Sequence, residues 1–157
     1  MAASQIRNAK TVIAIDLNPS RLQLAKSLGA THAILGSDPD VVSQIRKISP
    51  PFGVDFGVDC TGVPKVVRTM IDSLGPRGRA ATVGAPGLGV DVGLDIMGHL
   101  TFGREYVGCT EGDSYPREVS FHFFLLSFFL LFVSEKDPDS RMGGCLSARI
   151  GMIIANN

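Results

Sequence analysis

The chain has 157 residues, of which 45% are hydrophobic and 19% charged, and its formal net charge is zero. This length and composition predict one globular domain and exclude a mainly disordered chain. The balanced charge offers no basic surface to nucleic acid, so we expect no nucleic-acid partner. Three cysteines, Cys60, Cys109 and Cys145, lie far apart and favour neither a metal knuckle nor a disulfide framework, which makes reduced thiols and a cytoplasmic location the expectation.

The first predicted elements are a strand and a helix joined by a tight turn. Residues 12–15 form a short apolar run without polar alternation, which is typical of a parallel strand covered on both faces. Asn18 is a good N-cap, and Pro19 suits the first helical position because its missing N–H would be unpaired there. Gly29 supplies a stop for this helix. Asp16 therefore stands between the strand and the helix.

The same alternation continues along the chain. Residues 33–35 predict a short strand, after which Asp38 and Pro39 are expected to start a helix. Residues 54–59 predict the next strand, residues 60–62 a turn, and the apolar positions from Val66 to Leu74 a further helix. The segments RAATVGAPGLG and REYVGCTEG predict two more strands, the first ending in a glycine-rich loop. Strands that alternate with helices of about a dozen residues indicate right-handed βαβ crossovers and a parallel sheet.

Four segments occur in a characteristic order and spacing: TVIAIDLNPSRLQLAKSLGATHAI, GVDFGVDCTGVP, GRAATVGAP and GREYVGC. Together they resemble consecutive parts of the nucleotide-binding domain of zinc-type alcohol dehydrogenases, in the medium-chain dehydrogenase/reductase superfamily. The resemblance covers about residues 1–118 and is closest to NAD-dependent aryl- and benzyl-alcohol dehydrogenases. It implies an oxidoreductase that transfers hydride between an alcohol and NAD.

The resemblance gives Asp16 a role. In dinucleotide-binding folds, an acid at the end of the second strand accepts hydrogen bonds from the adenosine ribose and disfavours the extra phosphate of NADP. Asp16 therefore predicts NAD as the cofactor, and Arg21 matches a basic position that the family uses beside the same ribose. The alternative is that Asp16 is only a solvated carboxylate near a helix N-terminus and that Arg21 is a solvated surface side chain.

The resemblance also assigns two later turns to the cofactor cleft, since α/β sheets place ligands at the carboxyl ends of their strands. The first turn would line the cleft, and the backbone of the second would face the nicotinamide carboxamide. The residues are Cys60, Thr61 and Gly62 in the first turn, and Val83, Gly84 and Ala85 in the second. The alternative is that Gly62 and Gly84 only form turns and that Cys60 is a small buried hydrophobe.

The N-terminal part departs from the family pattern. A glycine fingerprint should precede the ribose acid by about 20 residues, but only fifteen residues precede Asp16 and none is glycine. We expect the chain to begin inside the first helix, after the first strand, which lies in the middle of a sheet ordered 3-2-1-4-5-6. Residues 11–16 and 54–59 should then either pair directly or leave an open seam. The predicted fold is an incomplete doubly wound, Rossmann-like parallel sheet that lacks its first strand.

Two functional consequences follow from these departures. Without a glycine turn and a helix N-terminus the pyrophosphate has no cradle, so we expect NAD binding to be weak or lost. The zinc ligands of the family come from a separate domain, and no residue here matches them. We therefore predict no metal ligand and no catalytic residue, and we expect the chain alone to be an inactive fragment.

The sequence from residue 119 to 157 does not follow the family, and we treat it as a divergent tail after a partial NAD-binding domain at residues 1–118. In residues 121–133 only His122 and Ser127 interrupt the apolar residues. This run is shorter than the 18 or so residues that span a bilayer, so we expect no membrane anchor. The abundance of Phe, Leu and Ser suggests the hypothesis that the tail is translated intron. Residues after Ser134 are expected to be disordered.

Two other classes of function remain open. The chain could be a non-catalytic nucleotide-binding or interaction module that pairs with a full-length relative through its last strand, REYVGC. It could also be another Rossmann enzyme, such as a methyltransferase that uses S-adenosylmethionine. The DCTG and VGAPG turns at dehydrogenase spacing argue against the methyltransferase.

Overall fold

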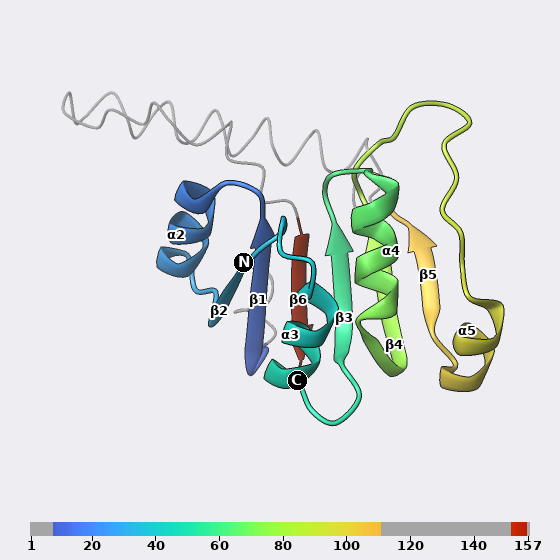
Figure 1. Ribbon diagram of the computed structural model, residues 1–157, viewed down its shortest axis with the longest axis horizontal. Helices are drawn as coiled ribbons and strands as arrows, with labels where there is room; N and C mark the ends of the chain where they lie inside the picture. The colour runs from blue at the N-terminus through green and yellow to red at the C-terminus, as the bar shows by residue number, and fades with distance from the viewer. Residues whose placement is uncertain (1–7, 111–151, 157) are drawn as a thin grey trace, which may run out of the picture. The chain divides into compact units, whose positions relative to one another are not determined.

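The computed structural model describes residues 8–110 and 152–156, which form one six-stranded sheet in the order β2-β1-β6-β3-β4-β5 (Figure 1). The elements in chain order are β1 (Thr11–Asp16), α2 (Pro19–Ser27), β2 (His32–Leu35), α3 (Val41–Ile48), β3 (Val54–Asp59), α4 (Pro64–Asp72), β4 (Leu74–Thr82), α5 (Ile96–Phe102), β5 (Glu105–Gly108) and β6 (Met152–Asn156). Strands and helices alternate as the sequence predicts. The α/β class and the Rossmann-like sheet are confirmed.

The middle of the sheet differs from both expected arrangements. β6 lies between β1 and β3 and runs antiparallel to each of them, whereas the other neighbouring strands of the described sheet are parallel (Figure 1). β1 and β3 therefore neither pair directly nor flank an open seam. The expectation of disorder after Ser134 is also wrong for residues 152–156. Their apolar, partly β-branched sequence MIIAN is compatible with a strand.

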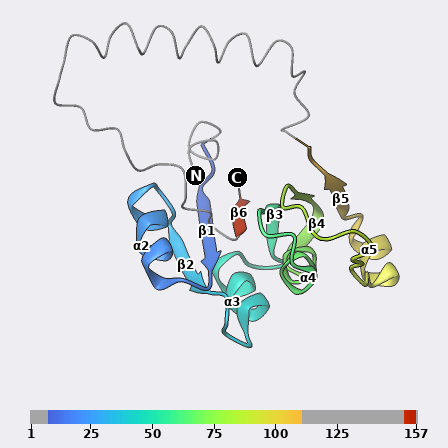
Figure 2. The ribbon, with the colours of Figure 1, turned by 90° about the horizontal axis from the view of Figure 1, so that it is seen from above.

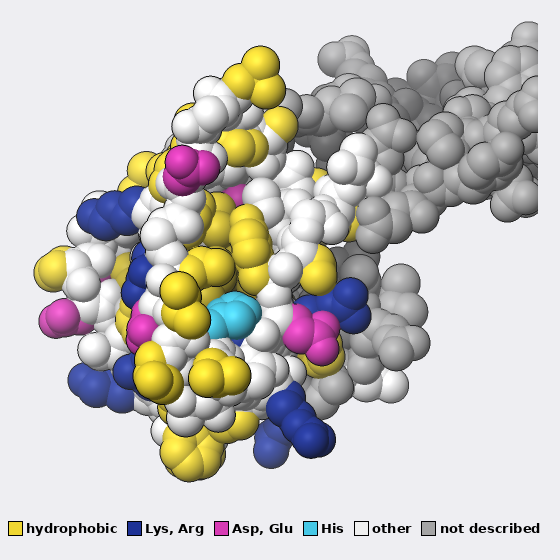
Figure 3. Space-filling view, turned by 90° about the vertical axis from the view of Figure 1, so that its right-hand side faces the viewer, with side chains coloured by type: hydrophobic (Ala, Val, Ile, Leu, Met, Phe, Trp, Pro, Cys, Tyr) yellow, Lys and Arg dark blue, Asp and Glu magenta, His cyan; other side chains and the backbone are white. Residues whose placement is uncertain are grey.

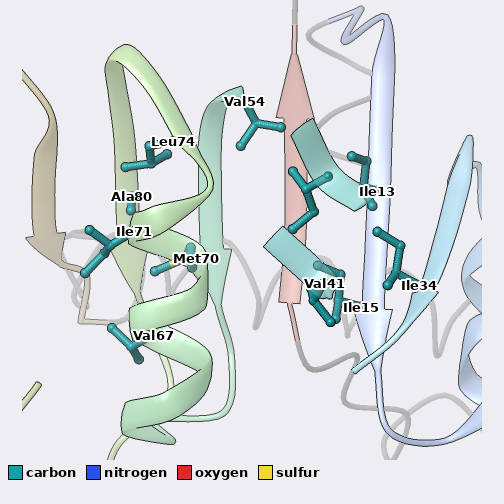
Figure 4. Close-up of a cluster of buried hydrophobic side chains, with 11 residues drawn as sticks. Ile13, Ile15, Ile34, Val41, Val54, Val67, Met70, Ile71, Leu74 and Ala80 are labelled. Atoms are coloured by element: carbon teal, nitrogen blue, oxygen red, sulfur yellow. The ribbon is translucent and has the colours of Figure 1, made fainter. Parts of the chain in front are cut away.

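The core has two parts because the side chains of β1 alternate between the two faces of the sheet. Ile13 and Ile15 belong to the larger cluster, in which β1, β3 and β4 pack against α3 and α4 (Figure 4). Ala14 belongs to a smaller cluster with Leu22 and Ala25 of α2. Viewed from above, α3 and α4 lie along the same side of the sheet (Figure 2). The covering of β1 on both faces explains its uninterrupted apolar sequence.

Local signals explain the first βα unit. The Asn18 side chain accepts a hydrogen bond from the Ser20 N–H at 2.9 Å, and Pro19 is the first residue of α2, as predicted. Gly29 has φ of 101°, a left-handed conformation that a residue with a Cβ rarely adopts. The sequence therefore determines both ends of this helix.

Two boundaries differ from the predictions. Helix α3 begins at Val41 instead of at Asp38 and Pro39, because Asp38 holds the preceding turn by accepting hydrogen bonds from Asp40 N and from Gln44 Nε2. Leu74, expected at the end of a helix, is the fully buried first residue of β4. Helix α5 was not predicted, and none of its residues is buried.

Among the residues that the structure describes, no helix is long and apolar enough to cross a membrane. The apolar run at residues 121–133, on which the prediction of no membrane anchor depends, lies outside these residues.

Candidate functional site

The predicted site residues follow three strands that end at the same edge of the sheet. β1, β3 and β4 are mutually co-directional, so the turns after them share the carboxyl edge. β6 enters the sheet at this edge, where Met152 is in register with both Ile15 and Asp59. The strand therefore separates the site residues into an Asp16 group on one side and an Asp59 group on the other.

The Asp16 group is formed by the end of β1 and the first turn of α2. One Asp16 carboxylate oxygen accepts a hydrogen bond from Asn18 N at 2.8 Å, and the other lies 3.7 Å from Arg21 Nη1. The Asp16 side chain is only 4% exposed, whereas that of Arg21 is 43% exposed. The structure thus brings the two predicted ribose-binding residues together, with Arg21 on the solvent side of the carboxylate.

The Asp59 group is organised by a carboxylate that is fully buried. One Asp59 side-chain oxygen accepts hydrogen bonds from Thr61 N at 3.0 Å and Thr61 Oγ1 at 2.6 Å, and the other accepts one from Gly62 N at 2.9 Å. The Asp59 main-chain carbonyl accepts two more, from Val83 N at 2.8 Å and Gly84 N at 3.1 Å. A single residue therefore holds both of the later predicted turns in place.

Two glycines let these turns approach each other closely. A Cβ on Gly84 would lie 2.5 Å from Thr61 N and would also overlap Gly62 N. Gly62 has φ of 67°, and a Cβ there would lie 2.7 Å from Pro86 N. Backbone contacts at such short range leave no room for a side chain at either position. The turn-forming interpretation of Gly62 and Gly84 is thus sufficient to explain these glycines, whether or not a ligand contacts them.

Cys60 lies half-buried in the first of the two turns, directly after Asp59. Burial raises the pKa of the Cys60 thiol above its ordinary value, and the neighbouring Asp59 carboxylate raises this pKa further. A thiol with a raised pKa is protonated at neutral pH and is a weak nucleophile and metal ligand. We therefore assign Cys60 no nucleophilic or metal-binding role.

All eight predicted site residues therefore lie at one sheet edge, six of them in two interlocked turns and two beside β1. Asp59 is the organising residue that the sequence analysis missed. Its signal was available in the segment DCTG, because an Asp two residues before a Thr commonly accepts hydrogen bonds from the following backbone N–H groups.

The described residues contain no group of three or more His, Cys, Asp or Glu side chains that could hold a metal ion. They therefore do not fit a zinc site, and we assign no step to zinc. The nucleotide is different, since Asp16 and the two turns provide acceptor groups and close-packed backbone at the edge where α/β sheets bind ligands.

Comparison with known proteins gives the same family as the motifs. A family model described as zinc-binding dehydrogenase matches residues 1–123. A probable alcohol dehydrogenase from Pseudomonas sp is 29% identical over 113 residues, which cover 71% of this chain and 35% of that protein. This chain thus spans about a third of that relative's length.

Solved structures agree with this result. An alcohol dehydrogenase zinc-binding domain protein from Burkholderia ambifaria is 47% identical with a TM-score of 0.69, covering 71% of this chain and 30% of that one. Benzyl alcohol dehydrogenase from Acinetobacter calcoaceticus is 36% identical with a TM-score of 0.71, covering 87% of this chain and 36% of that one. The chain therefore belongs to the zinc-binding dehydrogenase family.

Proposed function

We propose that the carboxyl edge of this sheet binds NAD, and that the chain is the cofactor-binding part of an alcohol dehydrogenase that transfers hydride between an alcohol and NAD. The observation that carries the proposal is the Asp16 carboxylate at the end of β1, held in place by Asn18 N and Arg21. A carboxylate at this position is suited to accept hydrogen bonds from the two ribose hydroxyls of adenosine. The likeness to benzyl alcohol dehydrogenase favours aromatic alcohols as the substrate class.

The preference for NAD over NADP follows from charge. An additional phosphate on the ribose would carry its negative charge to the nearly buried Asp16 carboxylate, where little solvent screens the repulsion. Arg21 is close enough to the same carboxylate to reduce this repulsion in part. We therefore expect a preference for NAD over NADP that depends on Asp16. The preference would be smaller if the Arg21 side chain turned toward the additional phosphate.

The nicotinamide end of the cofactor would lie against the two interlocked turns. Asp59 fixes both turns, so Thr61 and the backbone of Val83 to Ala85 are preorganised before a ligand arrives. Preorganised backbone groups bind a polar ligand without a further loss of conformational entropy. These turns support the proposed position of the carboxamide, which is the position that the family resemblance implies.

Within residues 8–110 and 152–156, the pyrophosphate of NAD would lack the helix N-terminus that usually binds it. In doubly wound folds it binds at the N-terminus of the helix that follows the central strand. Here the central strand β6 enters at the cofactor edge and leaves at the opposite one, so in residues 8–110 and 152–156 no helix follows it at the cofactor edge. We propose that this chain binds NAD weakly and, tested alone, does not oxidise an alcohol.

The test is calorimetric titration of the full chain with NAD and separately with NADP. We expect weak, saturable binding of NAD, weaker binding of NADP, and loss of NAD binding in Asp16→Ala. Asp55→Ala is the matched control, because Asp55 is an exposed carboxylate at the other end of β3. Equal binding by the wild type and Asp16→Ala, or no NAD binding by the wild type at millimolar concentration, would refute the proposal.

A second function, pairing with another protein chain, is favoured by one observation. Hydrophobic side chains gather on the side of the molecule that carries α5 and β5 (Figure 3), where Ile96, Met97 and Leu100 are 80%, 69% and 74% exposed. β5 is also an edge strand, whose outer backbone groups can pair with another strand. Exposed apolar surface of this kind marks interaction sites.

The partner proposed for this side is a full-length relative that joins through the last strand, β5. Light scattering coupled to size exclusion should show a complex when the chain is mixed with such a relative. Met97→Glu should abolish the complex, and Lys65→Glu, on the exposed surface of α4, should not. A mixture that elutes as two separate species would exclude this second function.

A further inference from the structure

The position between β1 and β3 is filled in an unusual direction. β6 pairs with β1 from Thr11 opposite Asn156 to Ile15 opposite Met152, and with β3 from Phe56 opposite Ala155 to Asp59 opposite Met152. Both pairings are antiparallel, in a sheet whose other described pairings are parallel. In the doubly wound order the central position belongs to a strand parallel to its neighbours. Two parallel strands separated by one gap can nevertheless accept a strand of either direction.

An empty gap at this position would be strongly unfavourable. With β6 in place, residues 12–15 of β1 are at most 5% exposed, and Ile13 and Ile15 belong to the larger core cluster beside the backbone that faces the gap. A buried N–H or C=O without a partner destabilises a fold by about 1–3 kcal/mol. β1 and β3 each present a row of such groups to the gap. Some extended segment must therefore occupy this position for the sheet to be stable.

We propose that the gap between β1 and β3 is a strand-acceptor site for an extended apolar peptide that runs antiparallel to both strands, and that the chain fills this site with its own residues 152–156. Recognition by strand addition depends mainly on main-chain hydrogen bonds, which any segment without proline can supply. This explains how a segment outside the family pattern can take the central place in the sheet. The inference concerns assembly of the sheet and is independent of nucleotide binding.

The first test disrupts the strand in the full chain with Ile154→Pro. Proline cannot donate a hydrogen bond to the ladder and is excluded from central strands. Because a lost hydrogen bond and a steric clash act together, we expect the melting temperature to fall by roughly 10 °C. Asp91→Pro, in the exposed loop before α5, is the control and should change the melting temperature by less than about 3 °C. A wild-type melting temperature for Ile154→Pro would overturn the proposal.

The second test supplies the strand in trans. A synthetic peptide with the sequence of residues 149–157 should raise the melting temperature of Ile154→Pro as its concentration increases, because a ligand that binds only the folded state stabilises it. The same peptide with proline at the position of Ile154 should have no effect. If the two peptides gave the same melting temperature for Ile154→Pro, the chain would have no acceptor site and the proposal would be overturned.

Two measurements on the unaltered chain keep the proposal testable if Ile154→Pro does not fold. Hydrogen exchange should protect residues 152–156 as strongly as residues 54–59, because they belong to one ladder. Rapid exchange of residues 152–156 alone would overturn the proposal. The melting temperature should be independent of protein concentration, and a rise with concentration would show that a second copy supplies the strand, which overturns the assignment to the chain's own residues.

Discussion

Asp16 and Asp59 occupy equivalent places in two βα units, yet their surroundings differ. Each is the last residue of a strand. Asp59 is in register with Met152 of β6, and Asp16 follows Ile15, the last residue of β1 that pairs with β6. The Asp59 side chain accepts hydrogen bonds from Thr61 and Gly62 in its own turn, while Asp16 accepts one from Asn18 N and lies beside the half-exposed Arg21. Asp59 is completely buried and Asp16 has Arg21 between it and solvent. A carboxylate at the end of a strand can therefore serve the fold or a ligand, and its partners indicate which.

Similar sequence motifs at Asp16 and Asp59 have different hydrogen-bond partners. DCTG and IDLN place an acid at the same point of a strand–turn–helix unit. The hydrogen-bond partners of Asp59 identify it as a carboxylate that organises a turn, whereas ribose binding by Asp16 is our proposal. Substitutions at the two residues should accordingly give opposite patterns of stability and binding.

The largest expected effect on stability comes from Asp59→Ala. The substitution leaves three donors without their carboxylate acceptor, so we expect the free energy of unfolding to fall by about 3 kcal/mol. Urea denaturation followed by circular dichroism measures this change. Asp91→Ala, at an exposed position of the loop before α5, should stay within about 0.5 kcal/mol of the wild type. Equal effects of the two substitutions would contradict the structural role of Asp59.

The next largest effect is expected for Gly84→Ala. The added methyl group would overlap the backbone of Thr61 and Gly62, and relieving the overlap should destabilise the fold by about 2 kcal/mol. Gly87→Ala is the matched control in the same loop, since a Cβ there meets its nearest neighbour at an ordinary 3.8 Å. If thermal melts showed the same stability for both variants, the two turns would not be interlocked as described.

Asp16→Asn should weaken NAD binding more than it weakens stability, which is the opposite of what we expect for Asp59→Ala. The amide keeps the shape of the side chain but loses the charge that attracts Arg21, and we expect a loss of stability of about 1 kcal/mol or less. Binding of NAD should weaken by about tenfold, because hydrogen bonds to a charged acceptor are stronger than those to a neutral one. Calorimetry and urea denaturation of the same preparation measure both quantities. A variant that loses stability and keeps NAD affinity would assign Asp16 to the fold alone.

The smallest effect is expected from pH and Cys60. The pKa of the Cys60 thiol is raised in the folded state relative to the unfolded state. The stability that depends on the protonated thiol is therefore fully present below the unfolded-state pKa of Cys60, and it is lost as the pH rises through the folded-state pKa. The free energy of unfolding should therefore decline in alkaline solution. Cys60→Ala should make this decline less steep, as measured by urea denaturation between pH 7 and 10. A steeper decline in the variant would mean that the sign of the shift is wrong.

Much of the fold could be predicted because its signals are local. Asn18, Pro19 and Gly29 define one helix through capping, ring geometry and a positive φ, which depend on nearest neighbours only. The position of Asp16 follows from the buried strand before it. The predicted helix start at Asp38 was wrong, because an Asp before a proline can hold a turn just as well as it can cap a helix.

The remaining parts depend on long-range contacts that a single sequence does not reveal. A five-residue apolar run such as residues 152–156 is compatible with a strand or with a buried helix, and nothing in its composition names its partners. Helix α5 has no buried face and therefore no apolar periodicity to indicate it. The role of Asp59 depends on two turns that are distant in sequence and meet only in the folded sheet.

The position of β6 has a consequence for the order of events during synthesis. Ile15 pairs with Met152, so the strand in the centre of the sheet is made long after both of its neighbours have left the ribosome. Contacts between residues so distant in sequence close slowly, because the loop entropy is lost before the pairing compensates for it. Until Asn156 has been translated, β1 and β3 remain a pair of unpaired edges in an otherwise formed βα scaffold, and such edges bind chaperones or other nascent chains.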